Sequence, residues 1–457
     1  MSILNRADLI ANGSTPKLRR IREDAINIVE SALESVDPRR AILNQVKRID
    51  SHLVIGDLKI DLDETERILV VGGGKAGKPM AEAIEELIGD RITDGIVNVP
   101  KGTQLEALER IFLNPAGHPI PDTYGVKGVL RITELVKGLT NRDLVIVLIS
   151  GGGSAMMPMP AETIDLHDLQ VLTDTLLRAG ATINELNSVR KHLSGFKGGL
   201  FAKNCRPAKV LSLIVSDVIG DPLDTIASGP TAPDSTTFQM AVDVLKKYSI
   251  WTNTSPTIKK RLEDGLAGDI DETPKKEDPI FRNVFNFVIA NNLIAADSAY
   301  KKACELGYNS MILSTFIEGE ARQVGVVFAG LAKGVINQST PMEIPCALIL
   351  GGETTVTVRG NGKGGRNQEL ALALVKKISD LRCVVLTFGT DGVDGSSDAA
   401  GAIVDGCTKR RADERGLSTL DYLENNDSHG FFSSLGDSIM TGPTGTNVND
   451  LTLILVR

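Results

Sequence analysis

Residues 68–80 read ILVVGGGKAGKPM, and this stretch decides which fold we expect. The four apolar residues 68–71 are typical of a strand that is buried on both faces, as in a parallel sheet. Three glycines and Lys75 follow, and Pro79 suits the first position of a helix because its missing N–H would have no partner there. The stretch therefore predicts a strand, a glycine turn and a helix start, where N–H groups and the helix dipole favour an anion.

Two familiar phosphate-binding patterns nearly match this turn. Its glycines satisfy G-x-G-x-x-G, but the next predicted strand, 96–99, ends in Pro-Lys, where a dinucleotide site needs an acid for the ribose. They also satisfy G-x-x-x-x-G-K, but Pro79 stands where a Ser or Thr would hold Mg²⁺. An ordinary tight turn would need glycines too. We expect a phosphate-binding loop that belongs to neither of these two types. In this loop Gly73 and Gly74 are expected to bind the nucleotide.

Length and composition indicate an enzyme-like globular protein. A chain of 457 residues predicts two domains, and 42% hydrophobic with 24% charged residues is the usual balance of a soluble protein. The net charge of −8 argues against nucleic-acid binding. Five cysteines without a CxxC pair suit reduced thiols, and no apolar run reaches transmembrane length. We expect a cytoplasmic protein without nucleic-acid or membrane partners.

Strand and helix patterns alternate along the first part of the chain, after an amphipathic helix near 18–32. This alternation predicts a parallel, doubly wound sheet with functional residues at the carboxyl ends of its strands. The further strands are expected at 96–99, 111–113, 144–149 and 210–215, and the helices near 125–136, 166–178 and 184–201.

The composition becomes polar and charged between residues 252 and 278, where we expect a domain boundary. The predicted fold class is α/β with two domains: a larger N-terminal Rossmann-like doubly wound sheet over 1–270, and a smaller C-terminal α/β domain with a mixed sheet over 280–457. In the second domain, the alternation at 354–359 predicts a half-exposed or antiparallel strand. The other strands are expected at 285–290, 310–313, 346–350, 383–387 and 451–456.

A second glycine loop, LISGGGSAMM at 148–157, has the same pattern as the first, a buried strand followed by a glycine-rich turn. A buried strand runs into backbone N–H groups and two hydroxyls that suit an oxyanion or phosphate. It lacks the G-x-S-x-G elbow of hydrolases, and a plain glycine-rich crossover loop is the alternative. The residues expected to bind substrate here are Ser150, Gly152, Gly153 and Ser154.

Charged residues follow on the next helix and strand. The planar guanidinium of Arg190 has paired N–H donors that match a carboxylate, so we expect this residue to bind one. His192 is as consistent with a structural role as with a functional one. Asp217 follows a buried strand, and an acid at that position can bind Mg²⁺ or take a hydroxyl proton.

Three polar glycine-rich loops mark the second domain, and each could be turn chemistry only. The first loop carries Glu353 in GGETTVTV and leads into GNGKGGRNQE, which opens a helix with Arg366 and Asn367. The planar donors of an arginine there match phosphate. GTDGVDG places Asp391 after a buried strand without EF-hand spacing, and TGPTGTNVNDL contains Asn447. We expect Glu353, Asn367, Asp391 and Asn447 to bind the nucleotide.

The motifs GGGKAG, NPAGHPIPD, ISGGGSA, NSVRKHLS, VSDVIGDP, GGETTVTV, GGRNQE, GTDGVDG and TGPTGTNVNDL occur in this order between residues 69 and 451. Together they resemble the glycerate 2-kinases of the MOFRL type. The resemblance implies an ATP-dependent, Mg²⁺-assisted kinase that converts D-glycerate to 2-phosphoglycerate in a cleft between two α/β domains. It also implies that the lysine of the first glycine turn and the arginine of GGRNQE, here Lys75 and Arg366, are the catalytic pair.

Elementary chemistry agrees with this resemblance, because phosphoryl transfer needs positioning and positive charge more than covalent chemistry. Lys75 and Arg366 would neutralise the transferring phosphoryl group, and neither is expected to be a core residue. Asp217 and Asp391 are candidates for metal ligand or catalytic base, and their roles stay open. Arg190 or the SGGGS loop would hold the glycerate carboxylate.

Two other functions stay open at this point. Some relatives are labelled hydroxypyruvate reductases, so an NAD(P)H-dependent reductase is the rival enzyme. A non-catalytic nucleotide-binding protein would keep the loops but tolerate the loss of Lys75 and Arg366. The oligomeric state is also open, with a homodimer as one option.

Overall fold

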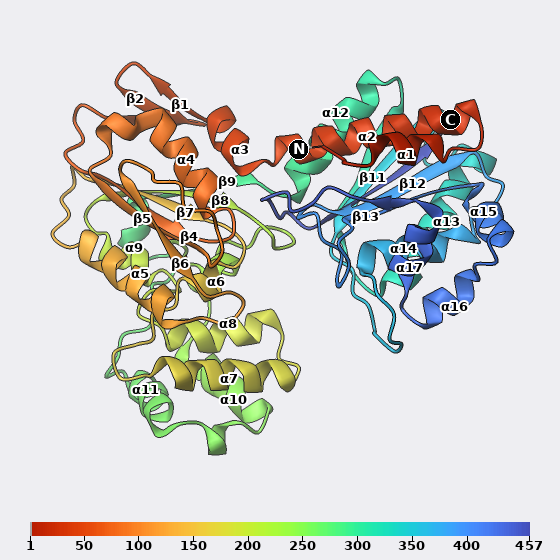
Figure 1. Ribbon diagram of the computed structural model, residues 1–457. Helices are drawn as coiled ribbons and strands as arrows, with labels where there is room; N and C mark the ends of the chain where they lie inside the picture. Colours follow the sequence, from red (N-terminus) through yellow and green to blue (C-terminus); the bar gives the residue numbers. More distant parts are fainter. Residues whose placement is uncertain (1) are drawn as a thin grey trace. The chain divides into compact units, whose positions relative to one another are not determined.

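The computed structural model describes residues 2–457. The chain folds into two compact units. The parallel-sheet unit is Pro38–Ile289, and the mixed-sheet unit joins the chain up to Asp37 with Ala290–Arg457 (Figure 1). This division departs from the expected domains 1–270 and 280–457 in two places, at the N-terminal arm and at the boundary.

The N-terminal arm packs on the mixed-sheet unit because its amphipathic helix finds its apolar partner there. After α1 (Arg6–Ala11), α2 (Pro16–Ser35) buries Ile21, Ala25 and Ile28. Its neighbours are α12 (Asn292–Glu305) and two strands of the mixed sheet. The sequence pattern predicted the helix but could not show which sheet its apolar face would cover.

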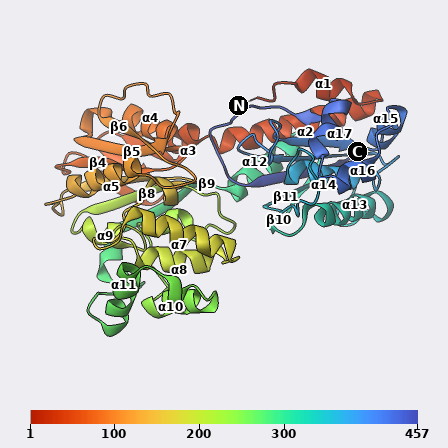
Figure 2. The ribbon, with the colours of Figure 1, turned by 60° about the horizontal axis from the view of Figure 1, so that its bottom comes forward.

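The polar stretch at 252–278 is not a boundary. It contains α11 (Pro256–Ala267), which buries Ile258 and Leu262 in the helical layer of the parallel-sheet unit. That layer also contains α7 (Leu166–Arg178), α8 (Ile183–His192) and α10 (Phe238–Lys247), which lie together in both views (Figures 1 and 2). The chain leaves the parallel-sheet unit only at residue 290, at the end of the strand that follows α11.

The parallel sheet has the doubly wound order expected from the sequence. Its strands are β4 (Ile68–Gly73), β5 (Asp94–Pro100), β6 (Ile111–Ala116), β7 (Leu144–Ile149), β8 (Lys209–Val215) and β9 (Val284–Ala290), in the spatial order β6-β5-β4-β7-β8-β9. Numbered along the chain this is 3-2-1-4-5-6, and the pairs among the first five strands are parallel. The strand expected at 285–290 in the second domain is therefore wrongly assigned, since it forms the edge of this sheet.

The order reverses between β4 and β7, so the loops after these two strands meet at the switch point where open α/β sheets bind ligands. The helix predicted at 184–201 is interrupted: α8 ends at His192, and α9 (Leu200–Asn204) begins after two glycines with positive φ. The remaining elements of this unit are α3 (Pro38–Gln45), α4 (Gly77–Ile88), α5 (Thr123–Leu135), α6 (Gly153–Met156) and an unpredicted antiparallel sheet of β1 (Val46–Ile49), β2 (His52–Ile55) and β3 (Leu58–Asp61).

The second sheet is mixed, as predicted. Only its β10–β11 pair is parallel, whereas the other neighbours run antiparallel. Its strands are β10 (Asn309–Ile317), β11 (Cys346–Gly352), β15 (Asp450–Val456), β12 (Cys383–Gly389), β13 (Gly401–Asp405) and β14 (Ser438–Ile439), in that spatial order.

Helices cover both faces of the mixed sheet (Figure 1). α2 and α12 pack together on one face, and α13 (Ala321–Gln338) and α14 (Arg366–Val375) pack together on the other. The latter pair shares an apolar core with alternate strand residues such as Leu348, Val385 and Ile454. Three short helices complete the unit: α15 (Thr408–Glu414), α16 (Thr419–Glu424) and α17 (Ser428–Leu435).

The strand predicted at 354–359 does not form. Thr355 makes only an isolated bridge to Glu320, and its N–H donates to the carbonyl of Gly319. The Thr357 N–H donates to the Glu320 carboxylate, so the segment is used to hold the start of α13. Among the helices of residues 2–457, none combines the length and apolarity needed to cross a bilayer.

Candidate functional site

The two glycine loops at the switch point of the parallel sheet interlock. The Lys75 N–H donates to the Gly151 carbonyl at 2.8 Å, and the Ala76 N–H donates to Ser150 Oγ at 3.0 Å. Gly74 allows this approach, because a Cβ there would lie 2.1 Å from Ser150 Oγ. Ser150 is therefore a residue that joins the loops.

This geometry corrects the expectation that the first turn offers free N–H groups. The Gly74 N–H donates to the Asn98 carbonyl at 3.1 Å, so the donors of Gly74, Lys75 and Ala76 are all occupied. In the described chain no acceptor is recorded for the N–H groups of Gly151 and Gly152. Within the described residues the Lys78 N–H at the start of α4 also has no recorded acceptor, so backbone donors for an anion lie there and in the second loop. Gly73 and Gly74 contribute close approach of the backbone.

Lys75 is exposed, and within residues 2–457 its ammonium group has no recorded ion pair. It acts electrostatically on His118, whose pKa is lowered by burial and by the Lys75 charge. His118 also lies against the second loop, since a Cβ at Gly152 would be 2.9 Å from its Nε2. Asp217 flanks the same loop, because a Cβ at Gly151 would lie 2.2 Å from its Oδ2.

Two cations converge on the carbonyl of Ser154 at the end of the second loop. Lys197 Nζ donates to this oxygen at 2.8 Å and Arg190 Nη2 donates at 3.3 Å. Burial lowers the pKa of Arg190 to about 10. Burial and the Arg190 charge lower the pKa of Lys197 well below its ordinary value.

The hydroxyl of Ser154 is also engaged. Ser154 Oγ bonds Ser228 Oγ, which in turn donates to Asn187 Oδ1 at 3.0 Å. Ala227 and Ser228 have positive φ values of 51° and 60°, a conformation that costs energy outside glycine and is common at functional sites. The Gly153 N–H bonds the Ser150 carbonyl. Within the described residues no acceptor is recorded for the N–H groups of Gly152 and Ser154, so these two of the four residues expected to bind substrate keep a backbone donor.

The neighbours of Arg190 on α8 are structural. Lys191 is buried and pairs with Asp234 at 3.1 Å and Asp224 at 3.3 Å. His192 is buried between the Ser188 carbonyl and Glu272, at 2.7 and 3.0 Å. The alternative left open for His192 is resolved in favour of packing.

The mixed-sheet unit holds Arg366 between two carboxylates. Nε and Nη2 donate to the two oxygens of Asp450 at 2.6 and 3.0 Å, and Nη1 donates to Glu353 Oε1 at 2.6 Å. Burial alone would lower the pKa of Arg366, but these two carboxylates raise it above its ordinary value. Glu353 is itself held by Asn449 at 3.0 Å. Arg366 therefore has structural partners, which lie 13 and 84 positions away in the sequence.

Hydrogen bonds also organise the other loops of this unit. Asp394 accepts from the N–H groups of Asn367 at 3.0 Å and Gln368 at 2.7 Å, and so caps the first turn of α14. Burial raises the pKa of Asp394 to about 7, although these bonds act in the opposite direction. Asp391 accepts from the Val393 N–H at 3.1 Å, and Asn447 accepts from the Asn449 N–H at 3.2 Å.

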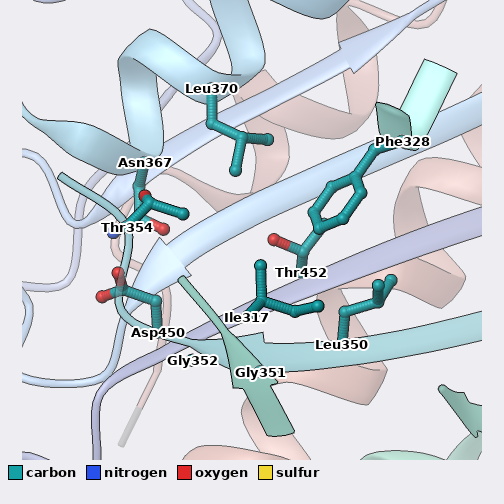
Figure 3. Close-up of a pocket in the computed structure, with 10 residues that line it drawn as sticks. All are labelled: Ile317, Phe328, Leu350, Gly351, Gly352, Thr354, Asn367, Leu370, Asp450 and Thr452. Atoms are coloured by element: carbon teal, nitrogen blue, oxygen red, sulfur yellow. The ribbon is translucent and has the colours of Figure 1, made fainter. Parts of the chain in front are cut away.

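A pocket of about 720 Å³ opens beside these loops. Arg366, Asp391 and Asp394 line it together with glycines of the loops 360–365 and 391–396 of the same unit. Its size suits a nucleotide-sized ligand. A second cavity, of about 20 Å³, shares the lining residue Thr354 with this pocket and has room for about one water. Asp450, Asn367 and Thr354 lie at one end of this cavity, and apolar side chains such as those of Phe328 and Leu350 lie at the other (Figure 3).

The donor set for a metal is small. Within residues 2–457 no group of three or more His, Cys, Asp or Glu side chains is arranged to hold an ion. Mg²⁺ commonly takes only one or two carboxylates and fills its other positions with water and substrate phosphates. Asp217 beside the second loop and Asp391 in the 720 Å³ pocket each meet that modest requirement.

Several of these polar residues were not singled out from the sequence. His118, Asn187, Lys197, Ser228 and Asp450 all contact the residues described above. His118, Asn187 and Asp450 stand inside the motifs NPAGHPIPD, NSVRKHLS and TGPTGTNVNDL, which was the available signal. Their partners lie far away in sequence, so no local spacing could reveal these contacts.

Comparison with known proteins identifies two families along the chain. Residues 24–263 match the family described as "Domain of unknown function (DUF4147)", and residues 346–450 match the "MOFRL family".

Similar proteins extend over nearly the whole length. A protein of Pyrococcus horikoshii named "Glycerate 2-kinase" is 41% identical over 95% of this chain and 97% of its own. A "D-glycerate 2-kinase" of Thermotoga maritima is 42% identical, with 95% and 98% covered. A crystal structure of glycerate kinase from the latter organism has a TM-score of 0.86 over 95% of this chain and 99% of its own, at 41% identity. A "Putative hydroxypyruvate reductase" of Agrobacterium vitis is 37% identical, with 94% and 93% covered.

Proposed function

The chain belongs to the glycerate 2-kinases of the MOFRL type, and on this premise we propose that it transfers the γ-phosphoryl group of ATP to the 2-hydroxyl of D-glycerate. The products are 2-phosphoglycerate and ADP. The observation that carries the proposal is a loop with two open N–H groups, flanked by the exposed Lys75, by Asp217 and by two cations on one carbonyl. Such a loop suits an acceptor that is itself an anion.

The acceptor binds at the second loop of the parallel-sheet unit. Its carboxylate takes the N–H of Gly152 and the guanidinium of Arg190, whose planar fork matches a carboxylate. The hydroxyls of Ser150 and Ser154 act indirectly, because they tie the loop to the first glycine turn and to Ser228. Gly153 allows the close packing of the loop on its neighbours.

The nucleotide binds in the 720 Å³ pocket of the mixed-sheet unit. Arg366 and Asp391 line this pocket, while Asn367 and Asn447 keep the surrounding loops in shape. Glu353 holds the guanidinium of Arg366 at the pocket. Gly73 and Gly74 of the first turn let the phosphate chain approach the backbone.

Catalysis then depends on charge and orientation. Lys75 and Arg366 both act on the transferring phosphoryl group, whose developing charge they stabilise. Asp217 orients the 2-hydroxyl and accepts its proton, or one of the two acids Asp217 and Asp391 would hold Mg²⁺. When bound, Mg²⁺ would neutralise phosphate oxygens and orient the nucleotide.

One assay tests this proposal directly. Purified protein with D-glycerate and Mg-ATP is expected to form ADP and phosphoglycerate, and the product is identified as the 2- or the 3-isomer. Hydroxypyruvate with NADH and with NADPH is the matched control, because a reductase has no use for Lys75 and Arg366 on a phosphoryl group. Oxidation of the reduced nucleotide without ATP-dependent phosphoglycerate formation would replace the kinase by the reductase.

We further propose a cytoplasmic enzyme that acts on small molecules and has no nucleic-acid or membrane partner. Its five cysteines are all unpaired, and its net charge is −8. A homodimer is the assembly to test, by light scattering over a range of protein concentrations.

A further inference from the structure

One buried lysine of the parallel-sheet unit has no carboxylate partner. Lys197 as a whole residue is 2% exposed, and its Nζ donates to the Ser154 carbonyl. Within residues 2–457 no ion pair is recorded for it. Lys191 is buried to the same degree, yet it pairs with Asp234 and Asp224. Proteins almost never bury a lysine fully unless it is paired.

Arg190 adds a second cation to the same oxygen. Its Nη2 lies 3.3 Å from the Ser154 carbonyl, and it too has no recorded ion pair within the described chain. Two positive groups therefore share one neutral acceptor. Burial and this repulsion explain why the pKa of Lys197 lies well below its ordinary value. Within the described chain no recorded ion pair supplies a negative charge to these two groups.

The surroundings indicate where an anion would supply that charge. The open N–H groups of Gly151 and Gly152 lie in the same loop as the Ser154 carbonyl. A carboxylate can accept hydrogen bonds from such N–H groups and from a guanidinium at the same time. The anion carried by the acceptor of the proposed kinase is a carboxylate.

We propose that Lys197 and Arg190 work as a pair that holds the carboxylate of the acceptor acid at the SGGGS loop, and that only this carboxylate compensates their charge. The inference rests on the proposed function and adds Lys197 as a positioning residue. Lys197 fixes the Ser154 carbonyl and contributes its positive field, whereas Arg190 touches the substrate. The pair makes the enzyme specific for hydroxy acids over uncharged alcohols.

This role predicts opposite effects on stability and on substrate binding. Lys197→Met removes a buried charge that has no counter-ion, so the free protein is expected to keep its melting temperature or to gain a few degrees. The same change removes one charge-assisted interaction from the bound state. We expect KM for D-glycerate to rise roughly 10- to 100-fold, with a smaller change in kcat and no change in KM for ATP.

Lys191→Met is the matched control. It is also a buried lysine, but its removal leaves Asp234 and Asp224 without their cation, so its melting temperature is expected to fall. Lys203→Met removes a half-exposed lysine from a surface ion pair and should change neither quantity.

The experiment compares thermal melts of the wild type and the three variants, without substrate and with D-glycerate or D-glyceramide. D-glyceramide keeps the hydroxyls and lacks the charge, so only D-glycerate should stabilise the wild type, and this shift should shrink in Lys197→Met. The inference is overturned if Lys197→Met melts as low as Lys191→Met, fails to fold, or keeps the wild-type KM. It is also overturned if D-glyceramide stabilises the wild type as much as D-glycerate does.

The proposed function fails separately, through its own readout. A wild type that forms no phosphoglycerate from Mg-ATP and D-glycerate refutes the kinase. The melts without substrate still test whether the charge of Lys197 is uncompensated.

Discussion

Replacing Arg366 by methionine would leave the carboxylate of Asp450 without its cation. The Asp450 side chain is 10% exposed and its two oxygens lie 2.6 and 3.0 Å from the guanidinium. Removing one partner of a buried ion pair costs about 3–5 kcal/mol. The Arg366 side chain is 32% exposed, so water recovers part of this loss, and we expect about 2–4 kcal/mol. For a unit of roughly 200 residues this lowers the melting temperature by about 4–16 °C.

A double-mutant cycle separates this structural role from the catalytic one. Asp450→Asn leaves Arg366 its contact with Glu353, so it should destabilise less than Arg366→Met. The double variant removes both charges and should recover part of the stability, with a coupling energy of about 1–3 kcal/mol. Activity should not recover, because Arg366 is still absent. The assays are thermal or denaturant melts and kcat with saturating Mg-ATP and D-glycerate.

The pH dependence provides an internal check with a defined sign. Burial raises the pKa of Asp450 to about 6, although Arg366 lowers it. This value lies above that of the unfolded chain, so Asp450 makes the wild type less stable as pH rises from about 4 to about 6. Without Arg366 the pKa of Asp450 rises further, and the loss continues to higher pH. The difference between Arg366→Met and the wild type should therefore be larger at pH 8 than at pH 5.

Three results would refute this reasoning. Stability losses that simply add in the double variant would mean that Arg366 and Asp450 do not interact in solution. A fall in kcat with an unchanged melting temperature would remove the structural role of Arg366. A fall in melting temperature with nearly wild-type kcat would remove its catalytic role.

Other predictions follow from the same contacts. Lys75→Ala should lower kcat by roughly 10³-fold, the scale of an arginine finger, and leave the melting temperature unchanged because the side chain is exposed and has no recorded ion pair in the described chain. The double variant Lys75→Ala/Arg366→Met should lose far less activity than the product of the losses of the two single variants, because both residues act on the same group. Losses that multiply would indicate that the two residues have separate tasks. Asp217→Asn and Asp391→Asn should raise the Mg²⁺ concentration needed for half-maximal rate or lower kcat strongly, and wild-type rates of both variants at limiting Mg²⁺ would make them turn residues only. Arg22→Leu should lower the melting temperature without lowering kcat at 25 °C, because it leaves the buried Asp405, 2.6 Å away, without its cation and leaves Asp437, 2.9 Å away, with Arg411 alone; an unchanged melt would contradict this.

The sequence alone determined the features that depend on local pattern. The apolar run at 144–149 forms β7 with the predicted ends, and the helix at 166–178 forms α7 with the predicted ends. Alternating strand and helix patterns predicted the doubly wound sheet, and glycines at strand ends marked both loops of the switch point. These features follow from side-chain periodicity and from backbone preferences, which act over a few residues.

Only the tertiary structure decided which groups meet. The N-terminal helix joins the mixed-sheet unit, and the donors of the first glycine turn are taken up by Asn98 and the second loop. Arg366 pairs with Asp450, which lies 84 positions away, and Lys197 meets the Ser154 carbonyl. A charge in a sequence does not indicate whether it is solvated, paired or left uncompensated. That depends on the contacts that long-range packing brings together, and these contacts decide which cations of this chain remain for a substrate.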